Sequence, residues 1–184
     1  MYPVIFHELP LAGAYRIEPQ LIVDHRGGFA RRFCAETFRA HGLESDFVQR
    51  SISYNRRAGT LRGMHFQAAP HLEAKLVRCT RGAIFDVIVD LRRSSTTFGR
   101  WYAETLTADS RVILYVPKGF AHGFQTLVDN TDVDYEISPA YVPGAERGFR
   151  FDDPGLAINW PVADAVISER DEALPPSFLE TLPG

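Results

Sequence analysis

Apolar and polar residues alternate over short stretches of this chain, with the two-residue period of half-buried β-strands. In residues 75–91, KLVRCTRGAIFDVIVDL, the even positions from Ile84 to Asp90 alternate with apolar residues at 85, 87 and 89. The dipeptide Arg81-Gly82 divides this stretch at a turn. The pattern therefore predicts two strands, one on each side of the turn.

Further β-rich runs follow, separated by residues that favour turns. The expected strands are 101–106, 111–116, 123–127 and 133–138, forming one pair from the first two and another from the last two. Helices are expected only at 35–41, where Gly42 stops the helix, and after Ser168, a suitable N-cap. Such spacing is typical of a sandwich or barrel. We therefore expect residues 1–184 to form a single, mainly β domain with an irregular tail from about residue 173.

Composition narrows the functional classes. Hydrophobic residues make up 45% and charged residues 23%, as in ordinary globular proteins, and the net charge is -3 with arginines dispersed among carboxylates. This distribution argues against a nucleic-acid partner. Cys34 and Cys79 form no paired motif, and the chain shows neither a signal-peptide pattern nor a membrane span. The expected setting is the cytoplasm, without membrane contact.

Residues 49–67, QRSISYNRRAGTLRGMHFQ, are the densest polar segment. Arg62, His65 and Gln67 would point into one cavity if this segment were a strand with a local kink. Histidine is suited to act as a base near neutral pH, and Arg62 with Lys75 could neutralise a diphosphate. A structural histidine beside solvated charges explains the same pattern, so spacing alone leaves both interpretations open.

The segment PKGFAHGF, residues 117–124, is expected to form a tight loop after a strand that ends at Pro117, with His122 held between two phenylalanines. It resembles the second motif of cupin barrels. Metal-binding cupins carry His-x-His in their first motif, where this chain has His65-Phe66-Gln67. Since a first-row metal needs three or four ligands, we expect no metal and no other cofactor. A metal-dependent cupin enzyme, such as a dioxygenase or sugar isomerase, remains the alternative.

A series of motifs extends through nearly the whole chain. They are DHRGGF (24–29), FVQ (47–49), GTLRGMHFQ (59–67), KLVRCTRGAIFDVIVDLRRSSTTFGRW (75–101), LYVPKGFAHGF (114–124), YEISPAY (135–141), DDPGLAINWP (152–161) and SERD (168–171). In this order they resemble the motifs of dTDP-4-dehydrorhamnose 3,5-epimerases. The resemblance implies a cupin-type jelly-roll β-barrel, an isomerase that needs no cofactor, and a nucleotide-diphosphate keto sugar as substrate.

The resemblance also implies roles for individual residues. His65 matches the general base, Asp171 the carboxylate that orients it, Tyr135 the proton donor on the opposite sugar face, and Lys75 the cation beside the enolate. The matched substrate-binding positions are Arg26, Phe29, Gln49, Ser51, Arg62, His122, Tyr141, Glu146 and Arg170. Family members are homodimers whose N-terminal segments complete the neighbour's site. Without the resemblance, Tyr135 would be interpreted as an interior tyrosine and Asp171 as a surface residue near a helix start.

Three stretches depart from the family pattern. Arg31 stands where the family has an acidic residue, Gln49-Arg50-Ser51 replaces a Gln-Asp-Asn run, and Ser53-Tyr54-Asn55 replaces a following Ser-x-Ser. These differences leave open a CDP-, GDP- or UDP-linked substrate and inversion at C3, at C5 or at both. A non-catalytic sugar-binding barrel is a further alternative, which loss of the base, its carboxylate or the acid would have favoured. None of the three is lost.

Overall fold

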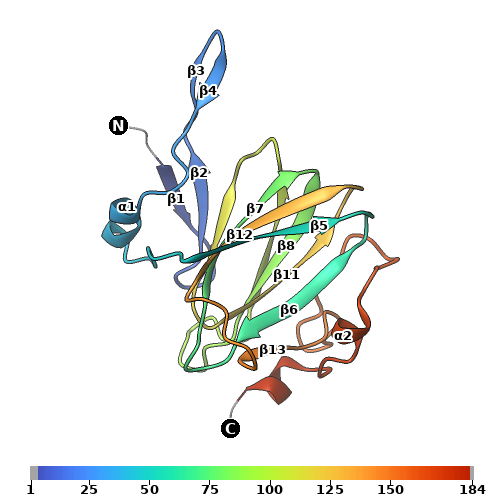
Figure 1. Cartoon of the computed structure of the whole chain (residues 1–184). Helices are drawn as coiled ribbons and strands as arrows, with labels where there is room; N and C mark the ends of the chain where they lie inside the picture. Colours follow the sequence, from blue (N-terminus) through green and yellow to red (C-terminus); the bar gives the residue numbers. More distant parts are fainter. Residues whose placement is uncertain (1–3, 183–184) are drawn as a thin grey trace.

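The computed structural model describes residues 4–182, in which two antiparallel β-sheets face one another (Figure 1). The larger sheet has the order β1-β2-β10-β7-β12-β5, the smaller β13-β6-β11-β8-β9, and β3 pairs with β4 alone. The strands are β1 (Val4–Glu8), β2 (Tyr15–Pro19), β3 (Ile22–Asp24), β4 (Gly27–Phe29), β5 (Gln49–Asn55), β6 (Leu61–Gln67), β7 (Ala74–Arg81), β8 (Ala83–Asp90), β9 (Trp101–Thr107), β10 (Ile113–Val116), β11 (Phe120–Thr126), β12 (Thr131–Ser138) and β13 (Glu146–Gly148). The helices are α1 (Ala35–Ala40), α2 (Glu169–Glu172) and the 3-10 helix η1 (Phe178–Thr181). This mainly β jelly roll confirms the predicted fold class.

Alternation along the strands creates the interior between the sheets. On β8, Ile84 and Ile88 point inward and join a core that includes Val77, Leu114 and Phe124 from both sheets. The intervening residues of β8 point outward and pack beneath the C-terminal third of the chain. Burying both faces of a strand requires this near-continuous apolar run, which residues 83–91 supply.

The strands expected to pair in sequence lie in opposite sheets. β9 belongs to the smaller sheet and β10 to the larger one, and β11 and β12 are divided in the same way. The two pairings predicted from the sequence are therefore wrong, although the strands themselves are present. Turns such as the one at Gly82, between β7 and β8, carry the chain from one sheet to the other. Sequence periodicity identifies a strand but contains no information on which edge it pairs with.

Two further expectations need correction. His122 lies in the middle of β11, a strand hydrogen-bonded on both sides, and the turn before it occupies only residues 117–119. The segment from about residue 173 is not wholly irregular, because η1 forms within it and Phe178 packs against the outer face of the smaller sheet. Its backbone N–H also donates to buried Asp153 at 2.8 Å.

The outer face of the larger sheet is covered over only part of its width. Phe38 of α1 packs with Ile17, Leu76 and Tyr115 of three neighbouring strands. The other part, formed by the outward residues of β12 and β5, carries charged side chains on β12 and exposes Ile52 and Tyr54 on β5. At the far edge of this sheet lies β1, which begins at Val4.

Candidate active site

A cavity of about 600 Å³ opens between the two sheets. It is lined by Ser51, Ile52, Ser53, Tyr54, Arg62, His65, Glu73, Lys75, His122, Tyr135, Ile137 and Arg170. The structure thus brings together three of the four predicted catalytic residues and four of the predicted substrate-binding residues. The fourth, Asp171, lies directly behind His65.

An irregularity in β6 directs both Arg62 and His65 into this cavity. His65 is paired with His122 of β11, and Arg62 with Phe124, so three steps on β6 match two on β11. This bulge places two residues an odd number of positions apart on the same face. Gly63 supplies the required backbone, with φ of 135° and no room for a Cβ beside Gly123. The local kink that was the condition for a shared cavity is present, and it directs Arg62 and His65 into the cavity but not Gln67.

His65 forms a pair with a buried carboxylate. Its Nε2 lies 2.8 Å from Oδ1 of Asp171, which is only 5% exposed. The side chain of Ser168 caps α2 by accepting from the backbone N–H of Asp171, so the helix start fixes the carboxylate. Burial disfavours the charged carboxylate, yet the hydrogen bond and charge of His65 outweigh it and lower the pKa of Asp171.

The hydrogen bond to Asp171 gives the two ring nitrogens of His65 different roles. A carboxylate that accepts from Nε2–H fixes the neutral tautomer in which Nδ1 has a free lone pair. The same carboxylate stabilises the imidazolium formed when that nitrogen takes a proton. Asp171 is therefore not the surface residue that its position alone suggested.

Tyr135 reaches the cavity from the other sheet, on β12. Burial raises its pKa well above the ordinary value; the charge of Asp86 acts in the same direction, and that of Arg62 opposes both. A phenol in this environment stays neutral near pH 7 and can donate its proton.

Lys75 is the cation in the larger sheet's wall. Its Nζ lies 2.8 Å from Oε1 of Glu73, and both side chains are mostly buried. Glu73 also accepts from Nε2 of Gln67 at 3.1 Å. The sequence analysis missed Glu73, which lies directly before β7 in a short connection that has no strand periodicity. The ion pair with Glu73 holds the Lys75 side chain in the cavity wall.

Most of the other predicted substrate-binding residues line the cavity or lie close to it, and only Arg26 and Phe29 lie far from it. Ser51 faces the cavity opposite Tyr135, and Arg170 reaches it while donating to Oε1 of Glu146 at 2.9 Å. Gln49, two residues before Ser51 on β5, accepts at 2.9 Å from the backbone N–H of Tyr141.

Arg26 and Phe29 are the exceptions. They lie on the β3–β4 hairpin, which projects away from the barrel (Figure 1). The guanidinium of Arg26 is paired with Asp24 of the same hairpin at 2.6 Å. In one copy of the chain these two residues do not reach the cavity.

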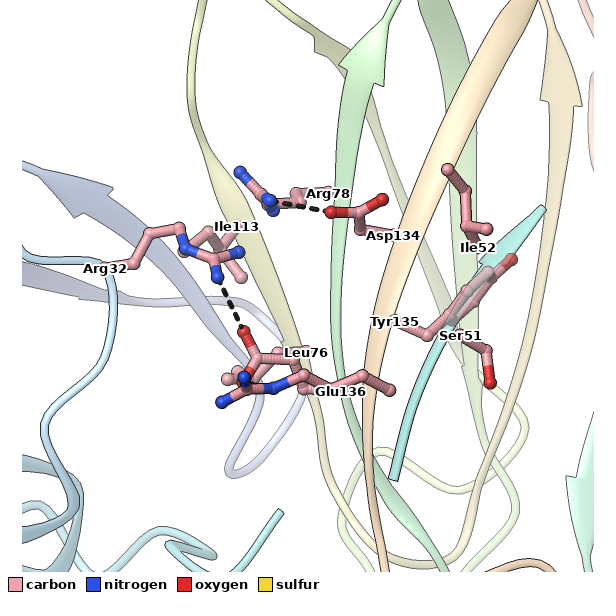
Figure 2. A pocket seen from close by; sticks show the side chains of 10 residues that line it. Arg32, Ser51, Ile52, Leu76, Arg78, Ile113, Asp134, Tyr135 and Glu136 are labelled. Carbon is pink, nitrogen blue, oxygen red and sulfur yellow. Dashed lines mark hydrogen bonds and ion pairs between the residues drawn. The ribbon is translucent and has the colours of Figure 1, made fainter. Parts of the chain in front are cut away.

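A second, smaller cavity of about 260 Å³ lies on the outer face of the larger sheet (Figure 2). Arg78 pairs there with Asp134 at 2.6 Å, and Glu136 lies 3.4 Å from both Arg32 and Arg50. Arg50 and Arg78 therefore point away from His65, because their neighbours Ser51 and Val77 occupy the inward phase. The substitution at Arg50 changes this outer cluster and not the lining of the larger cavity.

Two features bear on other classes of protein. Residues 4–182 contain no cluster of three or more His, Cys, Asp or Glu side chains placed to hold a metal ion. Within the same residues no helix has the length and apolar character needed to cross a bilayer.

Comparisons with known proteins agree on one family. The model of the dTDP-4-dehydrorhamnose 3,5-epimerase family matches residues 8–178. A protein of that name from Sinorhizobium fredii is 42% identical over 171 residues, covering 92% of this chain and 88% of the relative.

Solved structures extend this agreement to three dimensions. The Bacillus anthracis dTDP-4-dehydrorhamnose 3,5-epimerase with TDP and PPi bound aligns with a TM-score of 0.90 and 42% identity, covering 94% of this chain and 99% of that one. A 3'-monoepimerase from Streptomyces bikiniensis in complex with dTDP-quinovose aligns with a TM-score of 0.84 and 37% identity, covering 92% and 86%.

Proposed function

The chain belongs to the dTDP-4-dehydrorhamnose 3,5-epimerase family and is a carbohydrate epimerase, and we propose that it inverts a dTDP-linked 4-keto-6-deoxy sugar with His65 as base and Tyr135 as acid. The observation that carries the mechanism is the placement of these groups on opposite walls of one cavity. His65 lies on β6 of the smaller sheet and Tyr135 on β12 of the larger.

The chemistry needs such an arrangement. Protons on the carbons beside a C4 ketone are acidic because the resulting carbanion delocalises onto the ketone oxygen as an enolate. Nδ1 of His65 takes the proton, and the electron pair of the C–H bond moves into the enolate. Tyr135 then gives its proton to the opposite face of the same carbon. After product release the imidazolium of His65 gives up its proton to solvent and the Tyr135 phenolate takes one back, so that both groups return to their starting states. The overall change is one inverted centre with no net redox.

Lys75 and Asp171 support the two charged species. Asp171 stabilises the imidazolium of His65, and the ammonium of Lys75 is available to the developing enolate oxygen. Arg62 and Arg170, on the cavity wall and rim, supply positive charge for the diphosphate.

The proposed function is tested by assaying the purified chain with dTDP-4-dehydro-6-deoxyglucose in deuterated water. NMR of the sugar should show deuterium at C3, C5 or both, together with inversion. Comparison of the two carbons determines whether the chain acts as a 3,5-epimerase or, like the Streptomyces relative, at one centre.

Parallel thermal shifts with dTDP, UDP, GDP and CDP identify the nucleotide, since tighter ligands raise the melting temperature more. Absence of both exchange and inversion with every nucleotide would contradict the proposal.

We also propose that a second copy of the chain completes each site. The β3–β4 hairpin exposes Ile22, Val23 and Phe29, which is unusual for a monomer, and the edge strand β5 exposes Ile52 and Tyr54 beside the cavity. A partner's hairpin placed along this edge would cover both apolar surfaces and bring its Arg26 and Phe29 to the cavity mouth.

Subunit mixing tests this assembly. His65→Asn and Arg26→Ala should each be nearly inactive alone. Unfolded together and refolded, they should recover roughly a quarter of parental activity, because half of the dimers are mixed and one site in each contains only intact residues. Light scattering that shows only a 20.7 kDa particle, or mixtures that stay inactive, would contradict it.

The cytoplasm remains the proposed setting, and the unpaired thiols of Cys34 and Cys79 are consistent with it. The metal-dependent alternative is tested separately. Activity lost on chelation and restored by zinc, iron or manganese would replace the acid–base mechanism with a metal-assisted one.

A further inference from the structure

A second histidine–aspartate pair lies beneath the cavity. Nε2 of His122 on β11 is 2.8 Å from Oδ1 of Asp86 on β8, and the two residues are 4% and 0% exposed. His122 is also the register partner of His65, so the two imidazoles are neighbours on the inner face of one sheet. No role was assigned to Asp86 from the sequence.

The carboxyl group of Asp86 is incompletely hydrogen-bonded. Its Oδ2 has no hydrogen-bond partner among residues 4–182. Burial raises the pKa of Asp86, while the charges of His122 and Lys75 oppose that change. A buried carboxylate with one hydrogen bond destabilises a fold relative to an apolar residue of similar size. Packing alone therefore gives no reason for an aspartate at this position.

The charged and titratable groups facing Asp86 come from every strand around it. They are His122 from β11, Lys75 from β7, Glu104 from β9 and Tyr135 from β12. Glu104 is paired with Arg16 of β2, whose Nε lies 2.5 Å away and whose guanidinium also pairs with Glu18. The remaining three all belong to the proposed catalytic cavity.

His122 links Asp86 to Tyr135. The rings of His122 and Tyr135 pack edge to face, with centroids 5.8 Å apart and an interplanar angle of 78°. Because the hydrogen bond to Asp86 fixes the orientation of the imidazole, it also fixes one wall against which the phenol rests. The negative charge of Asp86 acts on the same phenol and disfavours its ionised form.

We propose that Asp86 is a positioning residue for the proton-donating side of the site. It holds His122 against Tyr135 in one tautomer, and its charge keeps the Tyr135 hydroxyl protonated until the sugar carbanion takes the proton. This role rests on the proposed epimerase function and adds a residue that never touches the substrate.

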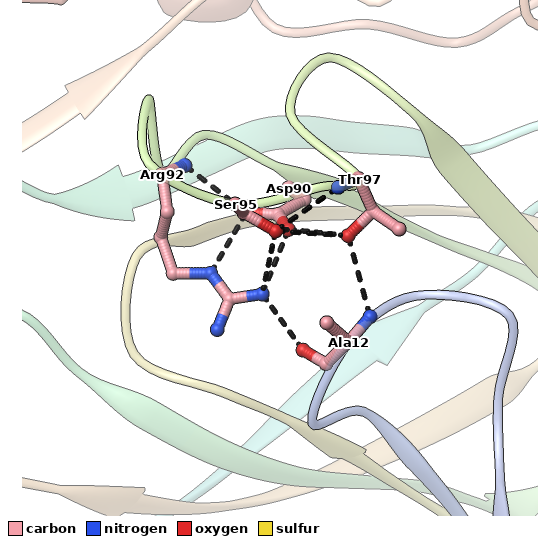
Figure 3. A network of polar contacts seen from close by, with 5 residues as sticks. All are labelled: Ala12, Asp90, Arg92, Ser95 and Thr97. Atoms are coloured by element: carbon pink, nitrogen blue, oxygen red, sulfur yellow. Dashed lines mark hydrogen bonds and ion pairs between the residues drawn. The ribbon is translucent and has the colours of Figure 1, made fainter.

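The same strand provides a matched control. Asp90 is also 0% exposed and points into the interior from β8, but it lies at the other end of the strand, where Arg92, Ser95 and Thr97 bind its carboxylate (Figure 3). Asp86→Asn and Asp90→Asn each remove one buried negative charge at nearly constant shape. Only the first removes it beside Tyr135.

In the epimerase assay, Asp86→Asn should lower kcat on the order of 10- to 100-fold, as for carboxylates that orient functional histidines, with little change in KM. The alkaline limb of its kcat profile should move to lower pH, since Tyr135 then ionises more readily. Asp90→Asn should lower the melting temperature but leave kcat and the pH profile unchanged. A kcat within twofold of the parent and an unmoved alkaline limb in Asp86→Asn would overturn the proposal.

A measurement independent of activity separates this proposal from the function itself. Nitrogen-15 NMR of labelled histidines in the parent, with His122 assigned by its loss in His122→Asn, should show the proton on Nε2. In Asp86→Asn the other tautomer should appear, because an amide can donate as well as accept. Parent protein with His122 protonated only on Nδ1 overturns the proposal even if Asp86→Asn does not fold. An inactive parent with the expected tautomer would contradict the epimerase function and leave the positioning geometry intact.

Discussion

Asp86 and Asp90 lie on the same strand, face the same interior and are equally buried, yet their surroundings differ in kind. Asp90 accepts hydrogen bonds from the side chains of Arg92, Ser95 and Thr97. These bonds outweigh the effect of burial and lower its pKa. Asp86 accepts one hydrogen bond, from His122, and burial raises its pKa.

The number of hydrogen bonds that each carboxyl accepts distinguishes a buried charge that holds the fold together from one that can serve function. The Asp90 network joins the β8–β9 connection to the β1–β2 turn, because Arg92 also donates to the carbonyl of Ala12 at 2.7 Å (Figure 3). Complete hydrogen bonding makes such a network a rigid structural joint. The carboxyl of Asp86, by contrast, has an oxygen that accepts no hydrogen bond from the described residues and lies beside a cavity. A polar group in such a place is available for catalysis or ligand binding. Variants at the two ends of the barrel should therefore lose different properties.

The largest effect is expected at the cavity end, for His65→Asn. The variant keeps a polar side chain beside Asp171 but lacks the base, so epimerisation should fall by a factor on the order of 10²–10⁴ or more. Exchange of the C3 and C5 protons with deuterated water, followed by NMR, should fall equally. Melting should change little, since His65 is partly exposed. Full activity in this variant would overturn the mechanism.

Tyr135→Phe should lose inversion by a comparable factor while retaining part of the solvent exchange. The base still forms the enolate, which can be reprotonated from the original side. The ratio of exchange to inversion, measured in one NMR time course, reports this division of roles. Exchange as low as in His65→Asn would show that the two residues do not act separately.

At the other end of the barrel, Asp90→Asn should affect stability instead. Weakening a buried network while leaving Arg92 without its counter-charge costs about 2–4 kcal/mol in the free energy of unfolding. Urea unfolding monitored by tryptophan fluorescence gives this value. Activity per folded molecule should stay at the parental level, and a loss of kcat would break the distinction between the two aspartates.

The Asp90 contribution also has a defined pH dependence. Its pKa is lower in the folded than in the unfolded chain, where about 3.9 is expected. The stabilisation is therefore complete above that value and is lost as the pH falls through the folded pKa. The stability difference between parent and Asp90→Asn should shrink below about pH 4. A difference that stays constant to lower pH would contradict the assignment.

The smallest effect is expected for Thr97→Val. It removes the hydroxyl that donates to Asp90 at 2.7 Å and accepts from the backbone N–H of Ala12 at 3.3 Å. The loss should be about 1–2 kcal/mol. Thr105→Val, the same change at an exposed position of β9, is the control and should stay within about 0.5 kcal/mol.

Much of the site could be predicted because its residues lie in motifs. His65, Lys75 and Tyr135 line one cavity, and Asp171 binds His65, as the resemblance implied. Glu73 and Asp86 were missed for different reasons. Glu73 lies outside any periodic segment, whereas Asp86 occupied the inward phase of a strand whose alternation was recognised. A carboxylate in that phase was the available signal, since buried aspartates require a partner.

The order of the residues alone identified the class of fold, the six strands from β7 to β12, the two short helices with their stop or cap residues, and the family. These features depend on local periodicity, turn chemistry and motifs, all of which involve residues close together in the sequence. Only the tertiary structure decided that consecutive strands belong to opposite sheets, that Arg50 and Arg78 face outward, and that Asp86 lies beneath Tyr135. Those relations join residues far apart in the chain through strand pairing and sheet packing, and a one-dimensional pattern records the phase of a strand but not its neighbours.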